Sequence, residues 1–90
     1  DSLVIRSLLH IGEFIEKISA AIKEVDLNSV ERIAHQIKII ANKIDADELK
    51  DSAFKIELAA RRGDHYEGLV CLEALKSEFE VYSAYSRSKS

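Results

Sequence analysis

The scarcity of residues that bend or break a chain is the strongest constraint on this sequence. It contains no Pro and only three Gly, at positions 12, 63 and 68. β-Hairpins and sheets need turn residues such as Gly and Pro at short intervals along the chain. The sequence is therefore predicted to fold into a few long helices that are joined by short polar corners.

The composition excludes several classes of protein. With 47% hydrophobic and 32% charged residues the chain is predicted to be globular. Its 13 basic and 16 acidic residues give a net charge of −3, which argues against nucleic acid because such binding depends on an excess of Lys and Arg. No uncharged apolar run approaches the roughly 20 residues of a membrane span, so we expect no membrane contact.

Cys71 is the only cysteine, and it cannot form an internal disulfide. A lone cysteine fits a reducing compartment, and no signal peptide is visible, so we expect a cytoplasmic location. The chain begins at Asp1 without Met, which indicates a piece of a longer protein.

Apolar residues recur at spacings of three and four in four segments, at about 3–24, 27–43, 46–62 and 65–85, as in amphipathic helices. Only short links separate these four segments. They predict an all-α, antiparallel up-down four-helix bundle, formed by one domain over residues 1–90. The residues expected to face the core are Val4, Leu8, Ile11, Ile15, Ile18, Ile22, Val30, Ile33, Ala34, Ile37, Ala41, Ile44, Leu49, Ala53, Ile56, Ala60, Gly68, Cys71, Leu72, Leu75, Phe79 and Tyr82.

Polar residues at the links predict where the helices begin and end. Asp26 is a candidate N-cap of the second helix, with Asn28 as a competing candidate. Asp45 and Asp64 each precede a Glu by three residues, which is the pattern of a capping box. Gly63 suits the left-handed position after the third helix, and the polar tail at 86–90 is expected to fray.

His35 is the residue that stands out for its chemistry. On a helical wheel centred on Ile37, His35 falls about 160° away, on the solvent side. Neutral imidazole is a nucleophile near pH 7 because its ordinary pKa is about 6.5. Lys38 lies one turn later and brings a cation to the ring. An inert surface histidine is the alternative interpretation.

Ile5, Leu9 and Ile39 are apolar residues that fall outside the predicted core. Ile39 lies on the same outer side as His35, and Ile5 and Leu9 lie off the inward stripe of the first helix. Together they are candidates for a small apolar surface that contacts a partner. The alternative is that Ile5 and Leu9 pack against a corner of the bundle.

Residues 34–41 read Ala-His-Gln-Ile-Lys-Ile-Ile-Ala. This string resembles the active segment of histidine-containing phosphotransfer (HPt) domains, Ala-His-x-Leu-Lys-Gly-x-Ala. Residues 49–64 fit the family's run Leu-x3-Ala-x2-Leu-Glu-x-Ala-Ala-Arg-x-Gly-Asp, and Asp26 stands nine residues before His35, where the family often has Asp. The resemblance covers residues 26–64.

The resemblance implies a phosphoryl carrier of a two-component phosphorelay. His35 would accept a phosphoryl group from a receiver aspartate and pass it to another receiver, with Lys38 as counter-charge. Gln36 is a candidate for a hydrogen bond to the ring or to the phosphate, or an ordinary boundary residue. The partner receiver would supply Mg²⁺, and the domain itself would need no cofactor.

The resemblance also implies a carrier domain that is no enzyme by itself and that belongs to a larger hybrid sensor histidine kinase. We expect a monomer that docks receivers through an outer surface. The candidate docking residues are Arg32, Ile39, Asn42, Ile5 and Leu9. His10 and His65 are not spaced with His35 like metal ligands, so no metal site is expected.

The chain departs from the family pattern at Ile39 and Asp45, where the family has Gly. A branched side chain at 39 would restrict which receivers dock, slow transfer, or mark a copy that no longer transfers. Two other functions remain open: a non-catalytic binding module that docks receivers without carrying phosphate, and an unrelated helical adaptor in which His35 is incidental.

Overall fold

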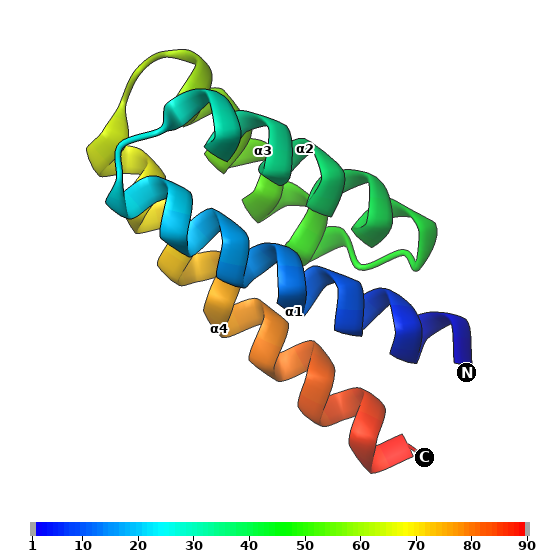
Figure 1. Cartoon of the computed structure of the whole chain (residues 1–90). Coiled ribbons are helices and arrows are strands. Elements are labelled where there is room, and N and C mark those ends of the chain that lie inside the picture. The colour runs from blue at the N-terminus through cyan, green and yellow to red at the C-terminus, as the bar shows by residue number, and fades with distance from the viewer. Residues whose placement is uncertain (1, 90) are drawn as a thin grey trace.

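A computed structural model describes residues 2–89 of the chain. Its four helices are α1 (Ser2–Lys23), α2 (Leu27–Lys43), α3 (Asp47–Arg61) and α4 (His65–Lys89). Successive helices run in opposite directions, as Figure 1 shows, and the bundle measures 40 × 18 × 18 Å. The predicted all-α four-helix bundle is confirmed.

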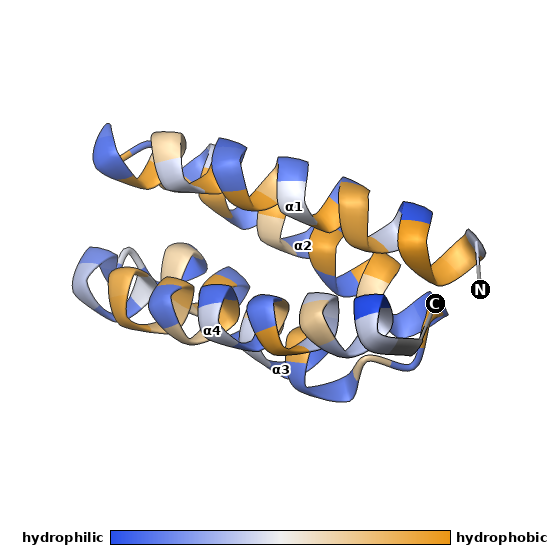
Figure 2. Cartoon of the chain, turned by 90° about the horizontal axis from the view of Figure 1, so that it is seen from below, coloured by the Kyte–Doolittle hydropathy of each residue, from blue (hydrophilic) through white to orange (hydrophobic). Residues whose placement is uncertain are grey.

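The helices form a ring in which each packs against its two neighbours in the order α1, α2, α3, α4. The contact between α2 and α3 is the most extensive, and the contact between α1 and α4 is the least. Figure 2 shows hydrophobic residues on the helix faces that meet and hydrophilic residues outside. The edge between α2 and α3 therefore lies opposite the more open edge between α1 and α4.

The predicted core agrees closely with the observed one. Buried isoleucines of α1 (Ile11, Ile18 and Ile22) meet Ile37 of α2 and Ile56 of α3. Burying one such side chain contributes roughly 1.5–3 kcal/mol. The predicted inward residues that are only half-buried lie mostly at helix ends and at the bundle's edges: Val4, Ile33, Ile44, Phe79 and Tyr82.

The three links share one backbone geometry. In the first, the Val25 amide donates to the Ile22 carbonyl and the Asp26 amide donates to the Ala21 carbonyl. This pair of bonds is a Schellman motif, which satisfies the free carbonyls at a helix end. The same bonds recur around Asp45 and Gly63, so three short links turn the chain in the same way.

Each motif places one residue in the left-handed region, with φ of 55° at Val25, 56° at Asp45 and 75° at Gly63. The prediction for Gly63 is therefore confirmed. The residue that follows caps the next helix, and the Asp26 and Asp64 carboxylates accept from amides three residues later. Asp26, not Asn28, caps α2.

The predicted capping box at Asp45 is wrong. The N-cap of α3 is Ala46, which makes no side-chain cap bond. Asp45 occupies the left-handed position that the motif requires one residue earlier, and Asp tolerates that conformation better than most residues. The link geometry therefore decides the cap, although the local sequence favours Asp45.

The expected end of the last helix is also wrong. α4 continues through Lys89 instead of ending near Tyr85, and the Ser88 hydroxyl donates to the Tyr85 carbonyl within this last stretch. No Gly or Pro follows Gly68, so no residue there breaks the helix. Ser90, the last residue of the expected frayed tail, lies outside the described residues.

Polar contacts fasten α4 to the other helices. The Tyr82 hydroxyl donates to Glu48 Oε1 at 2.5 Å, a bond that raises the pKa of Tyr82 to about 12. The Ser52 hydroxyl donates to Glu78, and His65 Nε2 donates to the Ile22 carbonyl at 2.8 Å. These bonds hold the register of α4 against both α3 and the end of α1.

Val25 offers a test of the link geometry, because a β-branched residue is strained at positive φ. Val25 is 56% exposed, so Val25→Gly removes this strain and little burial. We expect the free energy of unfolding to rise by about 1 kcal/mol, measured by urea unfolding. Val70→Gly, within α4, is the matched control and should lower it by about 1 kcal/mol. A less stable Val25→Gly variant would contradict the assigned strain.

Candidate functional site

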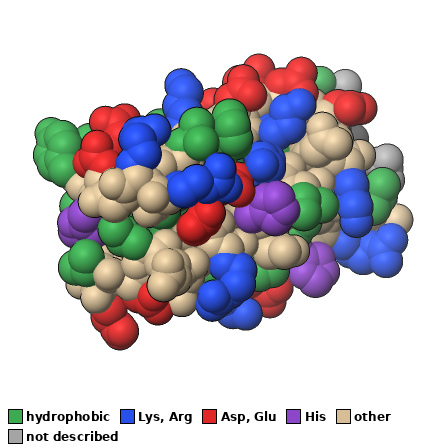
Figure 3. All heavy atoms as spheres, turned by 90° about the horizontal axis from the view of Figure 1, so that it is seen from above, with side chains coloured by type: hydrophobic (Ala, Val, Ile, Leu, Met, Phe, Trp, Pro, Cys, Tyr) green, Lys and Arg blue, Asp and Glu red, His purple; other side chains and the backbone are tan. Residues whose placement is uncertain are grey.

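His35 lies on the outer side of α2, between two residues that face the core. Ala34 and Ile37 are fully buried, whereas the His35 side chain is 47% exposed. The helical wheel thus places His35 correctly. Figure 3, the view from above, shows histidine, acidic, basic and hydrophobic side chains close together on this face.

A buried carboxylate from α3 meets the His35 ring. Glu57 is only 4% exposed, and its Oε2 atom lies 3.1 Å from His35 Nδ1. The same Oε2 accepts from Arg61 Nη2 at 3.0 Å, and Glu57 Oε1 lies 2.9 Å from Lys38 Nζ. Glu57 therefore joins one imidazole and two cations across the α2–α3 edge.

The local chain explains how Glu57 reaches this position. Small residues occupy buried positions on both helices, Ala34 and Ala41 on α2 and Ala53 and Ala60 on α3. Small side chains let helix axes approach closely. The contact between α2 and α3 is the most extensive one in the bundle, and it brings Glu57 of α3 to His35 of α2.

The charges of the cluster balance. Arg61 also donates from Nε to Glu31 Oε2 at 2.9 Å, so two cations (Lys38 and Arg61) face two carboxylates (Glu31 and Glu57). The Lys38 ammonium also lies 4.8 Å from the centre of the Phe54 ring. The charges of these four side chains therefore cancel one another.

Competing effects act on the ionisation of Glu57. Burial alone would raise the pKa of Glu57, but the nearby Lys38 ammonium and His35 ring outweigh it and lower the pKa below its ordinary value. The carboxylate is thus ionised at neutral pH, and an ionised carboxylate only accepts hydrogen bonds. His35 Nδ1 must therefore carry the proton, and in the neutral ring the lone pair lies on Nε2.

This geometry defines what the site can do. His35 Nε2 lies on the far side of the ring from Nδ1 and is not used by Glu57. A ring held in one tautomer by a carboxylate is a nucleophile at the other nitrogen, and the carboxylate stabilises the imidazolium that forms when that nitrogen reacts.

The other predicted residues of α2 are less closely tied to the ring. Gln36 and Ile39 are exposed beside His35, and among the described residues no hydrogen bond of Gln36 to the ring is found. Arg32 donates to the Ser29 hydroxyl at 3.2 Å, and Asn42 Oδ1 accepts from Lys50 at 3.3 Å. The hydrogen bonds of Arg32 and Asn42 thus go to residues other than His35.

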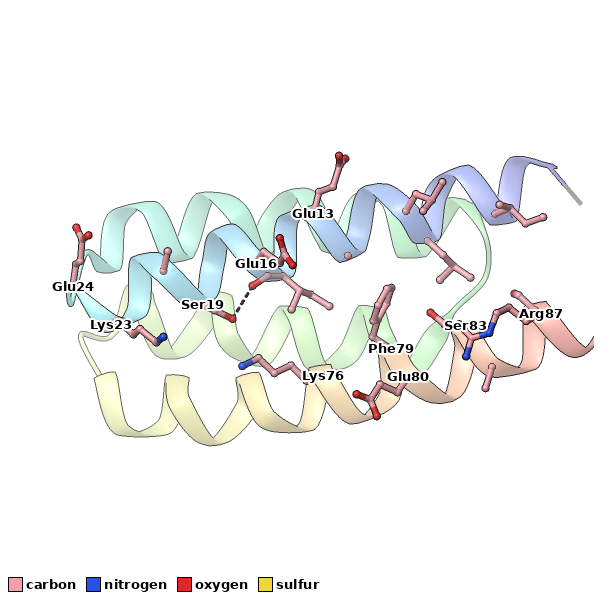
Figure 4. A pocket seen from close by; sticks show the side chains of 18 residues that line it. Glu13, Glu16, Ser19, Lys23, Glu24, Lys76, Phe79, Glu80, Ser83 and Arg87 are labelled. Carbon is pink, nitrogen blue, oxygen red and sulfur yellow. Dashed lines mark hydrogen bonds between the residues drawn. The ribbon is translucent and has the colours of Figure 1, made fainter.

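Ile5 and Leu9 lie elsewhere. They line a groove between α1 and α4 (Figure 4), together with Gly12 and Phe79. This groove follows the edge of the bundle opposite to the α2–α3 edge that carries His35. The structure therefore does not join Ile5 and Leu9 with Ile39 into one apolar surface.

The side chains that α3 contributes near His35 were not predicted from the sequence. Glu57 falls four residues after Ala53 and three before Ala60, at helical spacing on a buried face. A charged residue at such a position needs a counter-charge, and this was the available signal. Arg61 and Phe54 are likewise not predicted as parts of the site.

Within residues 2–89, no group of three His, Cys, Asp or Glu side chains is arranged to hold a metal ion. His10 pairs with Glu13 at 3.7 Å, and His65 is bound to the Ile22 carbonyl. None of the described helices is both long enough and apolar enough to cross a membrane.

Comparisons with protein-family models, with curated proteins and with solved structures found no match to this chain.

The buried position of Glu57 predicts a specific response to acid. Its folded-state pKa is lowered, so its stabilising contribution is complete above the ordinary pKa of about 4.5 and is lost as the pH falls through the folded value. Glu57→Gln should lower the free energy of unfolding by about 1–3 kcal/mol at pH 7. The variant should also lose less stability than wild type between pH 7 and pH 3, as measured by urea unfolding.

Glu73→Gln is the matched control, because it removes an exposed carboxylate from α4. We expect this control to keep both the stability and the pH dependence of wild type. Equal pH dependence in wild type and Glu57→Gln would show that Glu57 is not held as an ionised, paired carboxylate.

Proposed function

We propose that this chain is a phosphoryl carrier domain of a two-component phosphorelay and that His35 carries the phosphoryl group. The observation that supports the proposal is the bond from His35 Nδ1 to the buried Glu57 carboxylate. This bond leaves Nε2 as the nucleophilic nitrogen on an exposed edge of the bundle. The resemblance of residues 26–64 to HPt domains points to the same histidine independently of the geometry.

In the proposed step, the Nε2 lone pair attacks the phosphorus of an aspartyl phosphate on a receiver domain. The N–P bond forms, the P–O bond to the aspartate breaks, and the aspartate carboxylate leaves with the electron pair. The Nδ1 proton stays in place, so the phosphorylated ring is an imidazolium. Its positive charge lies against the Glu57 carboxylate, which stabilises it. Transfer to a second receiver reverses these bond changes.

The remaining roles in the proposal fall to the neighbours of His35 and to the receiver. Lys38 lies three residues from His35 and is the proposed partner of the phosphoryl oxygens, although at rest it is paired with Glu57. The receiver would supply Mg²⁺ and its own acidic pocket. Arg32, Ile39 and Asn42 surround His35 and form the proposed docking surface. The domain is a carrier and not an enzyme, and the proposed context is a hybrid sensor histidine kinase.

Chemical labelling tests His35 without a cognate partner. Phosphoramidate transfers its phosphoryl group to nucleophilic imidazoles with release of ammonia. We expect one acid-labile phosphate on wild type and none on His35→Gln, measured by intact-mass spectrometry at neutral pH and again after acid treatment. His10→Gln, which removes another exposed histidine, is the control and should label like wild type. Label that survives His35→Gln would disprove the assignment of His35.

A second candidate function, a binding module that docks receivers without carrying phosphate, is favoured by one observation. Ile39 is an apolar residue, 39% exposed, one turn from His35, and it can crowd a partner that approaches the ring.

Ile39→Gly separates the two functions. If the chain is an active carrier that Ile39 restricts, the variant should accept phosphate from a phosphorylated receiver faster than wild type. Because Gly within a helix costs about 1 kcal/mol, unfolding is measured in parallel, and Ile39→Ala serves as the helix-forming control. Receiver binding by wild type and both variants, with no transfer by any of them, would favour the binding module.

A further inference from the structure

Phe54 is a large aromatic residue on the surface of α3. It is 43% exposed and lies outside the buried core. The ammonium of Lys38 on α2 lies 4.8 Å from the centre of its ring. A cation within about 6 Å of an aromatic ring is attracted by the negative face of the ring, so the position of Phe54 is explained by Lys38 rather than by the core.

Two groups on α3 hold the same ammonium. Phe54 and Glu57 are three residues apart, on neighbouring turns of one face, and Lys38 Nζ lies 2.9 Å from Glu57 Oε1. A lysine side chain has many rotamers, and holding it in one place costs conformational entropy. A carboxylate alone fixes the distance to the charge, whereas the ring restricts the direction from which the ammonium approaches.

Lys38 is correspondingly well covered for a lysine, with a side chain only 26% exposed. The ammonium is thereby kept at the α2–α3 edge, three residues from His35 and on the same carboxylate that orients the imidazole. We propose that Phe54 is a positioning residue, which holds Lys38 where it can meet the phosphoryl oxygens on His35. This inference rests on the proposed function, and Phe54 is proposed to act only through Lys38.

The test compares substitutions that keep or remove the aromatic face. Phe54→Leu keeps an apolar side chain of similar size but lacks the ring, whereas Phe54→Tyr and Phe54→Trp retain it. We expect Phe54→Leu to slow phosphoryl transfer from a phosphorylated receiver about three- to fivefold, and the Tyr and Trp variants to transfer at nearly the rate of wild type. Equal slowing by all three variants would overturn the proposal in favour of a steric role.

A double-mutant cycle shows whether Phe54 acts through Lys38. In a Lys38→Met background, Phe54→Leu should cause no further slowing. Additive effects of the two substitutions would overturn the proposal, because Phe54 would then act independently of the ammonium.

The chain contains a matched control pair. Lys17 Nζ lies 5.5 Å from the centre of the Phe14 ring on α1, and neither residue contacts Glu57. Phe14→Leu should leave the rate of transfer unchanged after thermal unfolding has confirmed that the variant is folded. Slowing equal to that of Phe54→Leu would indicate a general effect of surface aromatics and would overturn the proposal.

Proton NMR separates this inference from the proposed function. The ring current of Phe54 should shift the Lys38 side-chain protons upfield in wild type and in Phe54→Tyr, but not in Phe54→Leu. Absence of the shift in wild type would overturn the proposal, whether or not His35 carries phosphate. A clear shift would support the positioning of Lys38 by Phe54. If His35 of the same protein took no phosphate, only the proposed function would be overturned.

Discussion

The burial of one carboxylate organises the α2–α3 edge of this bundle. Glu57 is almost fully removed from water, and an isolated buried charge is too costly to persist. Glu57 is stable there because a histidine and a lysine from α2 and an arginine from α3 surround it. The requirement to pair Glu57 sets the register of α2 against α3, and the same contacts fix the orientation of the His35 ring.

The links make this register possible. The Schellman motif around Asp45 is closed by bonds to the Asn42 and Ala41 carbonyls, so only three residues separate the end of α2 from the start of α3. A short and rigid link leaves two antiparallel helices little freedom to slide past each other. Once Ala46 caps α3, Glu57 lies opposite His35 without any adjustment by a longer loop.

Helical periodicity was sufficient to predict the fold and most of the core, because burial in an amphipathic helix follows from the positions of its own apolar residues. The same reasoning placed His35 on the outside correctly. It failed at Asp45, which was predicted to cap α3. The link requires a residue in the left-handed conformation at this position, so Ala46 is the N-cap instead. The predicted end of α4 was also too early. The polar composition of its last residues suggested fraying, but no Gly or Pro in that stretch breaks the helix.

The contacts of His35 could be predicted less well, for a physical reason. A helical wheel describes one helix, whereas the environment of His35 is formed by residues 22 and 26 positions later on another helix. Only the presence of a charged residue, Glu57, on a buried face indicated the contact. The sequence did not indicate which side chains pair with this carboxylate. The predicted apolar surface of Ile5, Leu9 and Ile39 failed for the same reason. The periodicity of one helix shows that a residue is exposed, but it does not show which edge of the bundle that residue faces.

The balance of charge around Glu57 has a consequence for the proposed chemistry. Lys38 and Arg61 are paired with Glu57 and Glu31, so neither cation of this cluster is available at rest to attract a phosphate from solution. A phosphoryl group on Nε2 adds negative charge that must be met by drawing Lys38 partly from Glu57, while the imidazolium takes its place beside the carboxylate. The cluster can therefore exchange one cation for another without leaving Glu57 unpaired. Such an exchange suits a group that carries phosphate only briefly and depends on its partner for the remaining charge.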